Sequence, residues 1–278
     1  MEDDMNKGYK GYQFLERFSK YTINTNKKYV YYTAIFGGYD GLKKPAFSKN
    51  KQYDFICFTD NKKLVKKNKG WRVVFVEENH RDPRRTARLF KVLNHYFIKG
   101  CQYSIWTDGK NELIQDFVPF IEKWEYFEFK TFSHFTRNCS YEEARVCIEE
   151  KKDLAEYLEP QIEKYRTAKF PEHHGLMNTS VLIRNHQSKK VSQVMQAWWD
   201  EIDAHSVRDQ VSLGYVLWKN GITTPEIPEK SQDFIINHGH NRFIFYDQYG
   251  KPFMNKKNWA FISRILRKVK NLTRQMVK

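Results

Sequence analysis

The stretch from Tyr103 to Gly109 places an acid directly after a run of aromatic and apolar residues. Tyr103 to Trp106 is typical of a buried strand, and the polar Thr107, Asp108 and Gly109 end it. An acid at the carboxyl end of a buried strand lies where open α/β sheets bind their ligands, and Gly109 leaves room for a bulky partner. Asp108 can there hold a divalent cation, which can in turn hold a diphosphate. The alternative is an ordinary strand-to-loop turn, because Asp-Gly is a common turn pair.

Similar aromatic and β-branched runs recur along the chain, separated by segments whose apolar residues have helical spacing. One such segment, residues 83–98, directly precedes the strand that ends at Asp108, and residues 141–168 form a long helical region. This order predicts an α/β fold with a mostly parallel central sheet flanked by helices. The strands that we expect are residues 29–36, 53–58, 71–76, 103–106, 126–132 and 179–184.

The chain divides into three parts by composition. Residues 1–28 are polar and lysine-bearing and predict an N-terminal arm. Residues 29–245 hold all the predicted strands, and the chain is long enough for one large α/β domain or two small ones. Residues 246–278 are basic, with apolar residues at helical spacing from Trp259 onward. They predict an amphipathic C-terminal helix that packs on the domain or makes a peripheral contact with an anionic membrane.

The charge and cysteine content narrow the class of protein. Lys plus Arg total 48 against 33 acids, and the formal net charge of +15 favours anionic partners. Much of the excess lies in lysine-rich loops, and the chain has no zinc-finger or RNA-binding aromatic signature, so we expect no nucleic-acid partner. The four cysteines form no C-x-x-C pair. The acidic start and the absence of any run of about 18 apolar residues predict a soluble, cytoplasmic protein without signal peptide or membrane span.

Polar groups follow two other predicted strands. Residues 37–41 form a glycine-rich loop in which Tyr39 can stack on a nucleotide base, although a plain turn is the alternative. Asp60 follows the next strand and suits a ribose or a uracil edge. Arg88 and Lys91 share one face of the predicted helix at residues 83–98. They either reach a diphosphate or belong to a solvated surface.

Further candidates lie in the second half of the chain. His134 and Arg137 follow the strand at 126–132. Asp209 and Gln210 lie in the first turn of a predicted helix, where polar side chains can point into a cleft. An acid at a helix N-terminus also has a purely structural explanation, its interaction with the helix dipole.

Several of these stretches, taken in order, form a recognisable set. They are residues 31–40, 55–60, 87–95, 103–109, 137–144, 183–186, 198–199 and 206–210. Together they resemble the glycosyltransferase-like family of the plant mucilage-related type, over residues 29–220. That family is similar to nucleotide-sugar glycosyltransferases of the GT-A fold. The resemblance implies that residues 29–245 are one GT-A-like domain, which moves a sugar from a nucleoside diphosphate sugar, expected to be a UDP-sugar, to a hydroxyl of a glycan acceptor.

The resemblance also implies a metal, Mn²⁺ or Mg²⁺. In GT-A folds an Asp-x-Asp motif ends a central strand, and its last acid holds the ion. Asp108 matches that last acid, while Trp106 stands in the place of the first. A histidine late in the chain often completes such a site, and His238 or His240 can serve here.

The remaining roles follow from the same resemblance. Thr33, Tyr39 and Asp60 are expected to face the nucleoside, and Arg88 and Lys91 to lie near the diphosphate, beside Asp108 and Gly109. Asn178 replaces the acid that the family usually has after Gly-Leu, and it bears on the choice of acceptor or sugar.

The chemistry needs a base, because an acceptor hydroxyl is a weak nucleophile. We expect an inverting enzyme in which Asp209 is the base, with Glu142 or Glu143 behind it. In a retaining enzyme Asp209 or Gln210 would instead flank the anomeric carbon. His134 and Arg137 are expected to bind the acceptor or the donor sugar. The rival hypothesis is a module of the same fold that binds a nucleotide or glycan without turnover.

Overall fold

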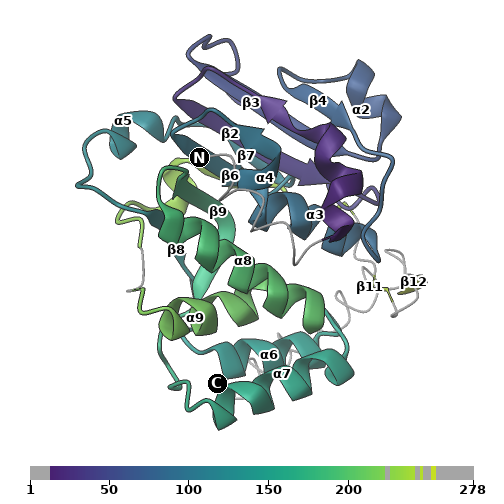
Figure 1. Cartoon of the computed structure of the whole chain (residues 1–278), viewed down its shortest axis with the longest axis vertical. Coiled ribbons are helices and arrows are strands. Elements are labelled where there is room, and N and C mark those ends of the chain that lie inside the picture. Colours follow the sequence, from purple (N-terminus) through teal and green to yellow (C-terminus); the bar gives the residue numbers. More distant parts are fainter. Residues whose placement is uncertain (1–12, 223–225, 242–244, 247–251, 255–278) are drawn as a thin grey trace, which may run out of the picture.

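The computed structural model describes residues 13–222, 226–241, 245–246 and 252–254. Its centre is a 6-stranded sheet with the strand order β4-β3-β2-β6-β9-β8 (Figure 1). The strands β2, β3, β4 and β6 run parallel, whereas β9 is antiparallel to both β6 and β8. The predicted α/β fold with a mostly parallel sheet is therefore confirmed. The strands are β2 (Tyr29–Ile35), β3 (Tyr53–Thr59), β4 (Arg72–Phe75), β6 (Tyr103–Thr107), β8 (Phe129–Ser133) and β9 (Met177–Asn185).

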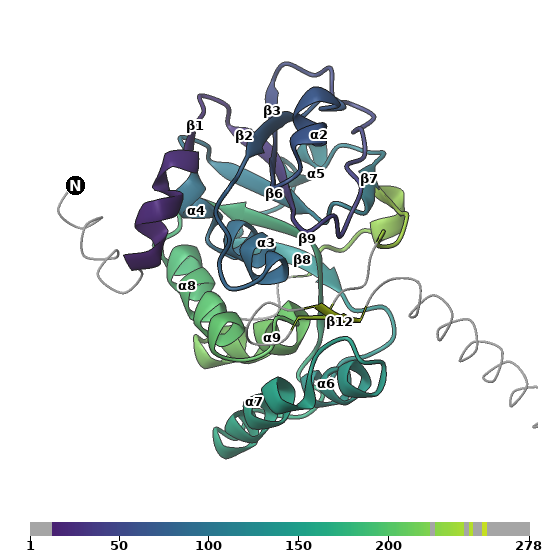
Figure 2. The same cartoon turned by 90° about the vertical axis from the view of Figure 1, so that its right-hand side faces the viewer.

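Helices cover the sheet and extend away from it. Figures 1 and 2 show α3, α4 and α8 beside the sheet, with α6 and α7 in the layer furthest from it. The helix α9 packs against α8 and α6, and α3 packs against α8. The helical elements are η1 (Gln13–Tyr21), α2 (Lys62–Lys66), α3 (Pro83–Val92), α4 (Asn94–Phe97), α5 (Val118–Ile121), α6 (Ser140–Glu149), α7 (Ala155–Thr167), α8 (Lys189–Ala204), α9 (Asp209–Lys219) and η2 (Ser231–Asp233).

Short strands complete the described part of the chain in pairs: β1 with β5, β7 with β10, and β11 with β12. The pairing of β7 with β10 is antiparallel and brings the segment after β6 beside a segment more than a hundred residues later. This contact matters for the site described below. The bounds are β1 (Ile23–Asn24), β5 (Ile98–Lys99), β7 (Asn111–Leu113), β10 (Ile235–Asn237), β11 (Phe245–Tyr246) and β12 (Pro252–Met254).

Both faces of the sheet are buried. Successive side chains of β2 point to opposite faces, so Tyr32 packs in one apolar cluster with Phe90 of α3 and Trp198 of α8. Tyr31 lies in a second cluster, on the other face, with Phe117. A strand buried on both faces needs apolar residues at nearly every position. This explains why the central strands are continuous aromatic and β-branched runs in the sequence.

The long helical region that we predicted at residues 141–168 is helical over most of its length, but it is divided into two helices, α6 and α7. Lys151, between them, has a left-handed backbone with φ of 53°. The carboxylate of Asp153 accepts hydrogen bonds from the hydroxyl of Ser206, at 2.6 Å, and from the backbone N–H of Val207, at 3.0 Å. These contacts with a distant segment fix the break between α6 and α7. Helical periodicity in the sequence cannot reveal them.

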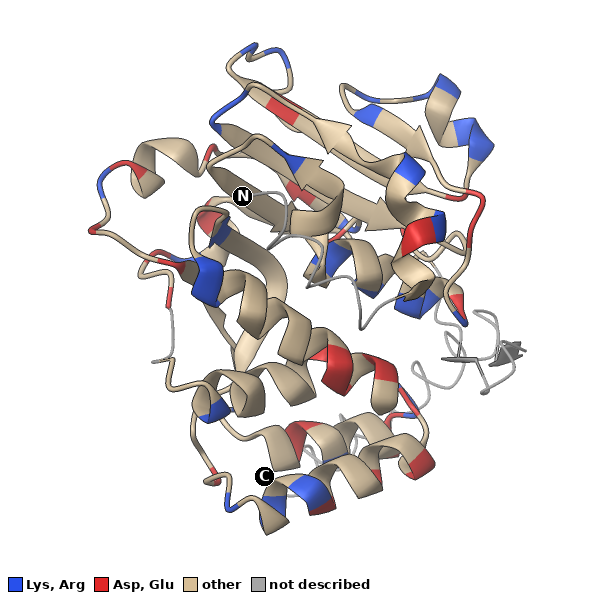
Figure 3. Ribbon diagram, viewed as in Figure 1, with Lys and Arg blue, Asp and Glu red and all other residues tan. Residues whose placement is uncertain are grey.

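The structure also bears on the predicted N-terminal arm, the predicted C-terminal helix, the absence of a membrane span and the surface charge. Leu15, Phe18 and Tyr21 of η1, which lie in the predicted arm, are buried in the core that contains α3 and α8. Most of the predicted C-terminal helix at 246–278 lies outside the described residues. Within the described ranges, no helix combines the length and the apolar character needed to cross a membrane. Figure 3 shows Lys and Arg gathered on α2, at the end of the molecule away from α6 and α7.

Asp116 forms hydrogen bonds with two tyrosines of the second apolar cluster. The hydroxyls of Tyr31 and Tyr53 donate to its two carboxylate oxygens at 2.5 Å and 2.6 Å. Burial, and then the negative charge of Asp116, raises the pKa of Tyr31 well above its ordinary value. Burial and the hydrogen bond to Asp116 raise the pKa of Tyr53 in the same direction.

This cluster predicts alkaline unfolding. In the unfolded chain a tyrosine ionises near pH ~10, whereas the folded protein keeps Tyr31 and Tyr53 protonated beyond that. The stabilisation is therefore complete below about pH 10 and is lost as the pH rises further. We expect the free energy of unfolding, measured with urea, to fall above that pH, and less steeply in Tyr31→Phe. Tyr126→Phe, at a side chain that is 76% exposed, is the matched control and should change nothing. An identical fall in Tyr31→Phe and the native chain would contradict the assignment.

Candidate active site

A small pocket opens at the carboxyl ends of β2 and β6. The chain leaves β2 toward β3 and β4 on one side and returns to β6 on the other, so the crevice between β2 and β6 is a topological switch point. Open α/β sheets bind ligands at such points. The enclosed space is about 30 Å³, room for a water molecule or two but well below a nucleotide. Its lining includes Tyr39, Arg84, Arg88, Asp108, Gly109 and His240.

Asp108 lies directly after β6 with two ammonium groups on its carboxylate. The Nζ of Lys91 lies 3.6 Å from Oδ1 and the Nζ of Lys110 lies 3.6 Å from Oδ2. The indole Nε1 of Trp106 donates to Oδ1 at 3.0 Å. Burial opposes ionisation of Asp108, but the positive charges of Lys91, Lys110 and Arg88 outweigh it and hold its pKa below the ordinary value. The carboxylate is thus charged at neutral pH and fixed in place.

Gly109 is required because the turn after β6 closely approaches the end of β2 and the loop that follows it. A Cβ built on Gly109 would lie 2.6 Å from Cγ1 of Ile35 and 3.0 Å from Cβ of Asp40. Contacts below 3 Å do not occur at a real Cβ, so a larger residue would push the β6 turn away from β2. The glycine therefore keeps Asp108 against the end of β2.

Asp209, the predicted base, lies in a buried group of charges behind the pocket. Its Oδ2 is 2.5 Å from the Nζ of Lys91 and 3.0 Å from the Nε of Arg88. The side chains of Asp209 and Lys91 are 3% and 1% exposed. Burial raises the pKa of Asp209, but the charges of Arg88 and Lys91 outweigh that effect and hold it well below the ordinary value. Burial lowers the pKa of Lys91, and its two carboxylate neighbours oppose that shift.

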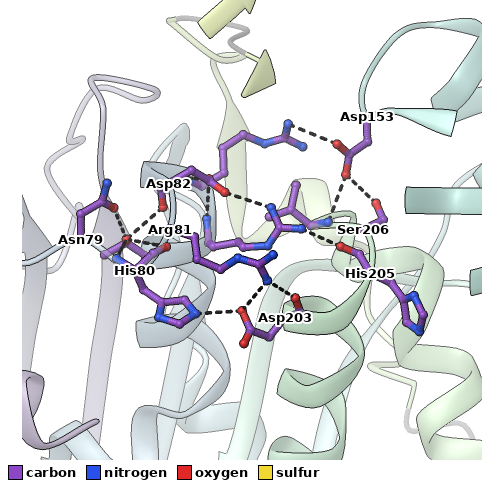
Figure 4. Close-up of polar contacts among 12 residues, drawn as sticks. Asn79, His80, Arg81, Asp82, Asp153, Asp203, His205 and Ser206 are labelled. Atoms are coloured by element: carbon purple, nitrogen blue, oxygen red, sulfur yellow. Dashed lines mark hydrogen bonds and ion pairs between the residues drawn. The ribbon is translucent and has the colours of Figure 1, made fainter. Parts of the chain in front are cut away.

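A second polar network fixes α3 and the residues before it against the end of α8 and the segment between α8 and α9 (Figure 4). The Nε2 of His80 lies 2.8 Å from Oδ1 of Asp203. Arg85 donates through Nη1 to Asp82 at 2.9 Å and through Nη2 to the carbonyl of His205 at 2.6 Å. Asp82 also caps α3 by accepting from the first backbone N–H groups of the helix. This network sets the distance between the basic face of α3 and the first turn of α9.

The two acids of α6 point in different directions. Glu143 is buried and accepts a hydrogen bond from the Nε of Arg137 at 2.7 Å, with the Nη2 of Arg208 at 3.9 Å. Glu142 instead lines a separate open groove between α6 and α7. Glu142 and Glu143 were both predicted to support Asp209. Glu143 forms an ion pair with Arg208, the residue before Asp209, whereas Glu142 lies away from the pocket.

The predicted nucleoside residues take three different positions. Tyr39 lines the pocket, with its ring centroid 4.6 Å from that of His240. Asp60 accepts a hydrogen bond from the backbone N–H of Gly37 at 2.8 Å, so it holds the loop that presents Tyr39. Thr33 is buried inside β2, and its hydroxyl has no hydrogen-bond partner among the described residues.

The predicted sugar-binding residues gather where β8 ends and β9 begins. The Nδ1 of His134 accepts from the backbone N–H of Arg137 at 3.2 Å. Gln210 lies 3.4 Å, through Nε2, from the carbonyl of Met177. Asn178 lies in β9 and accepts from the backbone N–H of Ser180 at 3.1 Å, and the carbonyl of Ser180 in turn accepts from the N–H of Asp108 at 2.9 Å. The strand β9 therefore links this group to Asp108.

The two histidines predicted as metal ligands differ in position. His240 lines the pocket, with Nδ1 2.6 Å from Oδ1 of Asp40 and Nε2 3.1 Å from the Nζ of Lys110. Burial lowers its pKa, although Asp40 opposes that shift, so the ring is neutral at pH ~7. His238 lies outside the pocket, where its Nε2 is 2.7 Å from a carboxylate oxygen of Glu112.

This arrangement does not fit a divalent ion at Asp108. Both oxygens of its carboxylate face an ammonium group, and a divalent cation placed there would be repelled by both. In the part of the chain that the structure describes, no three His, Cys, Asp or Glu side chains are grouped as a metal site needs.

Sequence reasoning missed three residues of the pocket region: Asp40, Arg84 and Lys110. Asp40 and Lys110 lie directly beside the residues that we singled out, Tyr39 and the Asp108–Gly109 pair. Their signal was this adjacency, since a residue next to a ligand-binding turn shares its loop. What adjacency could not supply is the partner of each side chain.

Comparisons with known proteins agree with the resemblance seen in the sequence. Residues 4–232 match the model of the TOD1/MUCI70 glycosyltransferase-like domain. A relative from Arabidopsis thaliana, the "Probable hexosyltransferase MUCI70", is 26% identical over 212 residues, which cover 66% of this chain and 36% of that protein. The chain thus spans little more than a third of the relative's length.

Two solved structures of glycosyltransferases are similar at lower levels. The bifunctional glycosyltransferase WbbM in its apo form has a TM-score of 0.45 at 9% identity and covers 74% of this chain and 40% of its own. Mouse xyloside xylosyltransferase 1, also apo, has a TM-score of 0.41 at 10% identity and covers 74% of this chain and 85% of its own. The family match, by contrast, spans most of the sequence. The chain belongs to the TOD1/MUCI70 glycosyltransferase-like family.

Proposed function

We propose that this chain transfers a sugar from a nucleoside diphosphate sugar, with uridine as the nucleoside, to a hydroxyl of a glycan acceptor. The observation that supports it is the pocket at the switch point between β2 and β6, where Asp108 and Gly109 face Arg84 and Arg88 of α3. Membership of the family and the hexosyltransferase name of the plant relative favour the same activity. We propose that the sheet and this pocket correspond to the donor site of a GT-A enzyme.

The basic face of α3 supplies the electrostatic part of the mechanism. Departure of the diphosphate leaves negative charge on its oxygens. Arg84 and Arg88 line the pocket, and Lys91 lies behind them against Asp108 and Asp209. Fixed cations in a partly buried site stabilise developing negative charge more than solvated cations do, because the protein need not reorganise during the reaction.

Asp209 suits a positioning role in this arrangement. A base must reach the acceptor hydroxyl and have a pKa near the working pH. The carboxylate of Asp209 is buried between Lys91 and Arg88, and their charges hold its pKa low, which makes it a weak base. We propose that it orients these two cations toward the diphosphate. The inverting route stays a prediction, which the anomeric configuration of the product tests.

The pocket must open to admit a donor. Its closed form has Tyr39 and His240 in ring contact across the opening loops. Tyr39 belongs to a loop with two glycines in left-handed conformation, Gly37 and Gly38, with φ of 61° and 63°. Such a loop changes conformation at low cost, because glycine tolerates both signs of φ. We propose that uridine stacks on Tyr39 after this loop has moved.

A thermal-shift screen of UDP, GDP and their sugars, followed by an assay of nucleotide release, tests the function. A donor present at about 100 times its Kd should raise Tm by roughly 5–10 °C. Arg88→Gln should lose most of this shift, whereas Arg72→Gln, at an exposed arginine of β4, should keep it. Release of UDP when an acceptor glycan is added completes the test. Binding without release would favour the non-catalytic module, and no shift with any nucleotide would refute the proposal.

A further inference from the structure

We infer that the ammonium group of Lys110 takes the place of the divalent cation at this donor site, so that the site works without a metal. The inference rests on the proposed function, because it concerns how the charge of the leaving diphosphate is balanced. It starts from one juxtaposition: the side chains predicted as ligands of the cation, Asp108 and His240, both contact the Nζ of Lys110.

The hydrogen-bonding pattern around His240 matches a bound ammonium. Asp40 lies 2.6 Å from Nδ1 of His240, which places the ring proton on that nitrogen. The Nε2 atom then keeps its lone pair and accepts from the Nζ of Lys110 at 3.1 Å. The carboxylate of Asp108 provides the second contact, at 3.6 Å. An imidazole lone pair and a carboxylate are the groups that a divalent ion would use, and here both are turned toward the lysine.

The backbone holds Lys110 in this position. Lys110 lies inside the tight turn in which the N–H of Asn111 donates to the carbonyl of Asp108 at 2.9 Å. Its own carbonyl accepts from the N–H of His238 at 3.1 Å, and Asn111 pairs with Asn237 in the β7–β10 sheet. The segment that carries His240 is therefore attached to the segment that carries Lys110. The pairing of β7 with β10 therefore holds the side chains of Lys110 and His240 near each other.

The charges favour an anion over a second cation. The Nζ of Lys91 lies 3.6 Å from the other oxygen of Asp108, so one carboxylate faces two ammonium groups. The side chain of Lys110 is 16% exposed, and both of its side-chain contacts line the pocket. A diphosphate entering the pocket meets a net positive charge, whereas Mn²⁺ or Mg²⁺ would have to displace Lys110 first.

The first test is metal binding without any nucleotide. Free Mn²⁺ is measured by its EPR signal in titrations of the whole chain. We expect no tight site in the native protein, and in Lys110→Ala a Kd for Mn²⁺ at least about tenfold lower, because Asp108 and His240 are then released. Lys63→Ala, at an exposed lysine of α2, should behave as the native chain. Tight Mn²⁺ binding by the native protein that Asp108→Asn removes would overturn the inference, whatever the enzyme's activity.

The second test is UDP binding by calorimetry in EDTA and in Mn²⁺. We expect the two Kd values to agree within about twofold, Lys110→Met to weaken binding at least about tenfold, and Lys110→Arg to retain most of the affinity. Unchanged far-UV circular dichroism and Tm would show that Lys110→Met folds. UDP binding that requires Mn²⁺ overturns the inference and leaves the proposed function standing. If no nucleotide binds in either condition, both fall together.

Discussion

Asp108→Asn is expected to lower kcat for sugar transfer by about 10²–10³-fold without weakening the binding of UDP. The carboxylate of Asp108 holds Lys91 and Lys110, each at 3.6 Å. An amide keeps the shape and an acceptor for the indole of Trp106 but loses the charge that positions the two ammonium groups. Misplaced cations no longer meet the charge as it develops on the diphosphate, and such errors of about 1 Å are costly in rate. Removing one negative charge leaves the affinity for a bound anion equal or higher.

Steady-state kinetics with separate kcat and KM, together with calorimetry for UDP, check this prediction. Asp233→Asn, at an exposed acid of η2, is the matched control and should match the native chain. The Tm of Asp108→Asn should stay close to the native value. A fully active variant would remove Asp108 from the mechanism. A loss of UDP affinity as large as the loss of kcat would instead indicate that Asp108 binds the diphosphate through a metal.

Asp209→Ala is expected to cost about 3–5 kcal/mol of the free energy of unfolding. The Nζ of Lys91 lies 2.5 Å from Asp209, and its side chain is 1% exposed, so the change leaves a buried charge without its closest partner. Arg88 is 20% exposed and can turn toward water, so most of the cost falls on Lys91. Asp108, at 3.6 Å, offsets only part of it. Breaking one partner of a buried ion pair is costly for this reason.

Urea unfolding at neutral pH measures this loss. Glu156→Ala is the matched control, because Glu156 is an exposed acid in the first turn of α7, where the helix dipole contributes only about 0.3–1 kcal/mol. Replacing both partners, as in Lys91→Met with Asp209→Leu, should recover part of the stability. A loss in Asp209→Ala no larger than that of the control would mean that Lys91 is not held by Asp209.

The same ion pair makes a pH-dependent contribution to stability. The folded-state pKa of Asp209 lies well below that of an unfolded aspartate, which is about 3.9. Its contribution is therefore present above that pH and is lost as the pH falls below it. The free-energy difference between native chain and Asp209→Ala should accordingly be largest near neutral pH and shrink in acid.

The sequence allowed the position of the pocket to be predicted, because most of the residues that determine it lie in a few short stretches of the sequence. The central strands are buried on both faces, so each appears as an apolar run, and the polar break marks its end. Asp108 and Gly109 follow β6 directly, and Tyr39 follows β2 within a few residues. Parallel strands bring these breaks to one edge of the sheet. Helical spacing likewise placed Arg88 toward the same edge, where it lines the pocket.

The partners of the charged side chains could not be predicted, because they come from distant parts of the chain. Asp209 meets Lys91 from a position 118 residues away, and His240 meets Lys110 from 130 residues away. Neighbouring residues on a helix point about 100° apart, which is why Glu142 and Glu143 face different surroundings although the sequence treats them alike. Neither effect can be predicted from composition or periodicity.

The place of β9 has a consequence for how the chain is made. This strand lies between β6 and β8, although residues 177–185 leave the ribosome long after both of them. Until then β6 is paired only with β2, and its other edge presents unpaired backbone groups to solvent or to any chain nearby. A nascent chain that stalls before β9 is made therefore exposes this aromatic strand edge and is prone to aggregate. A chaperone that covers the edge is most important at this stage.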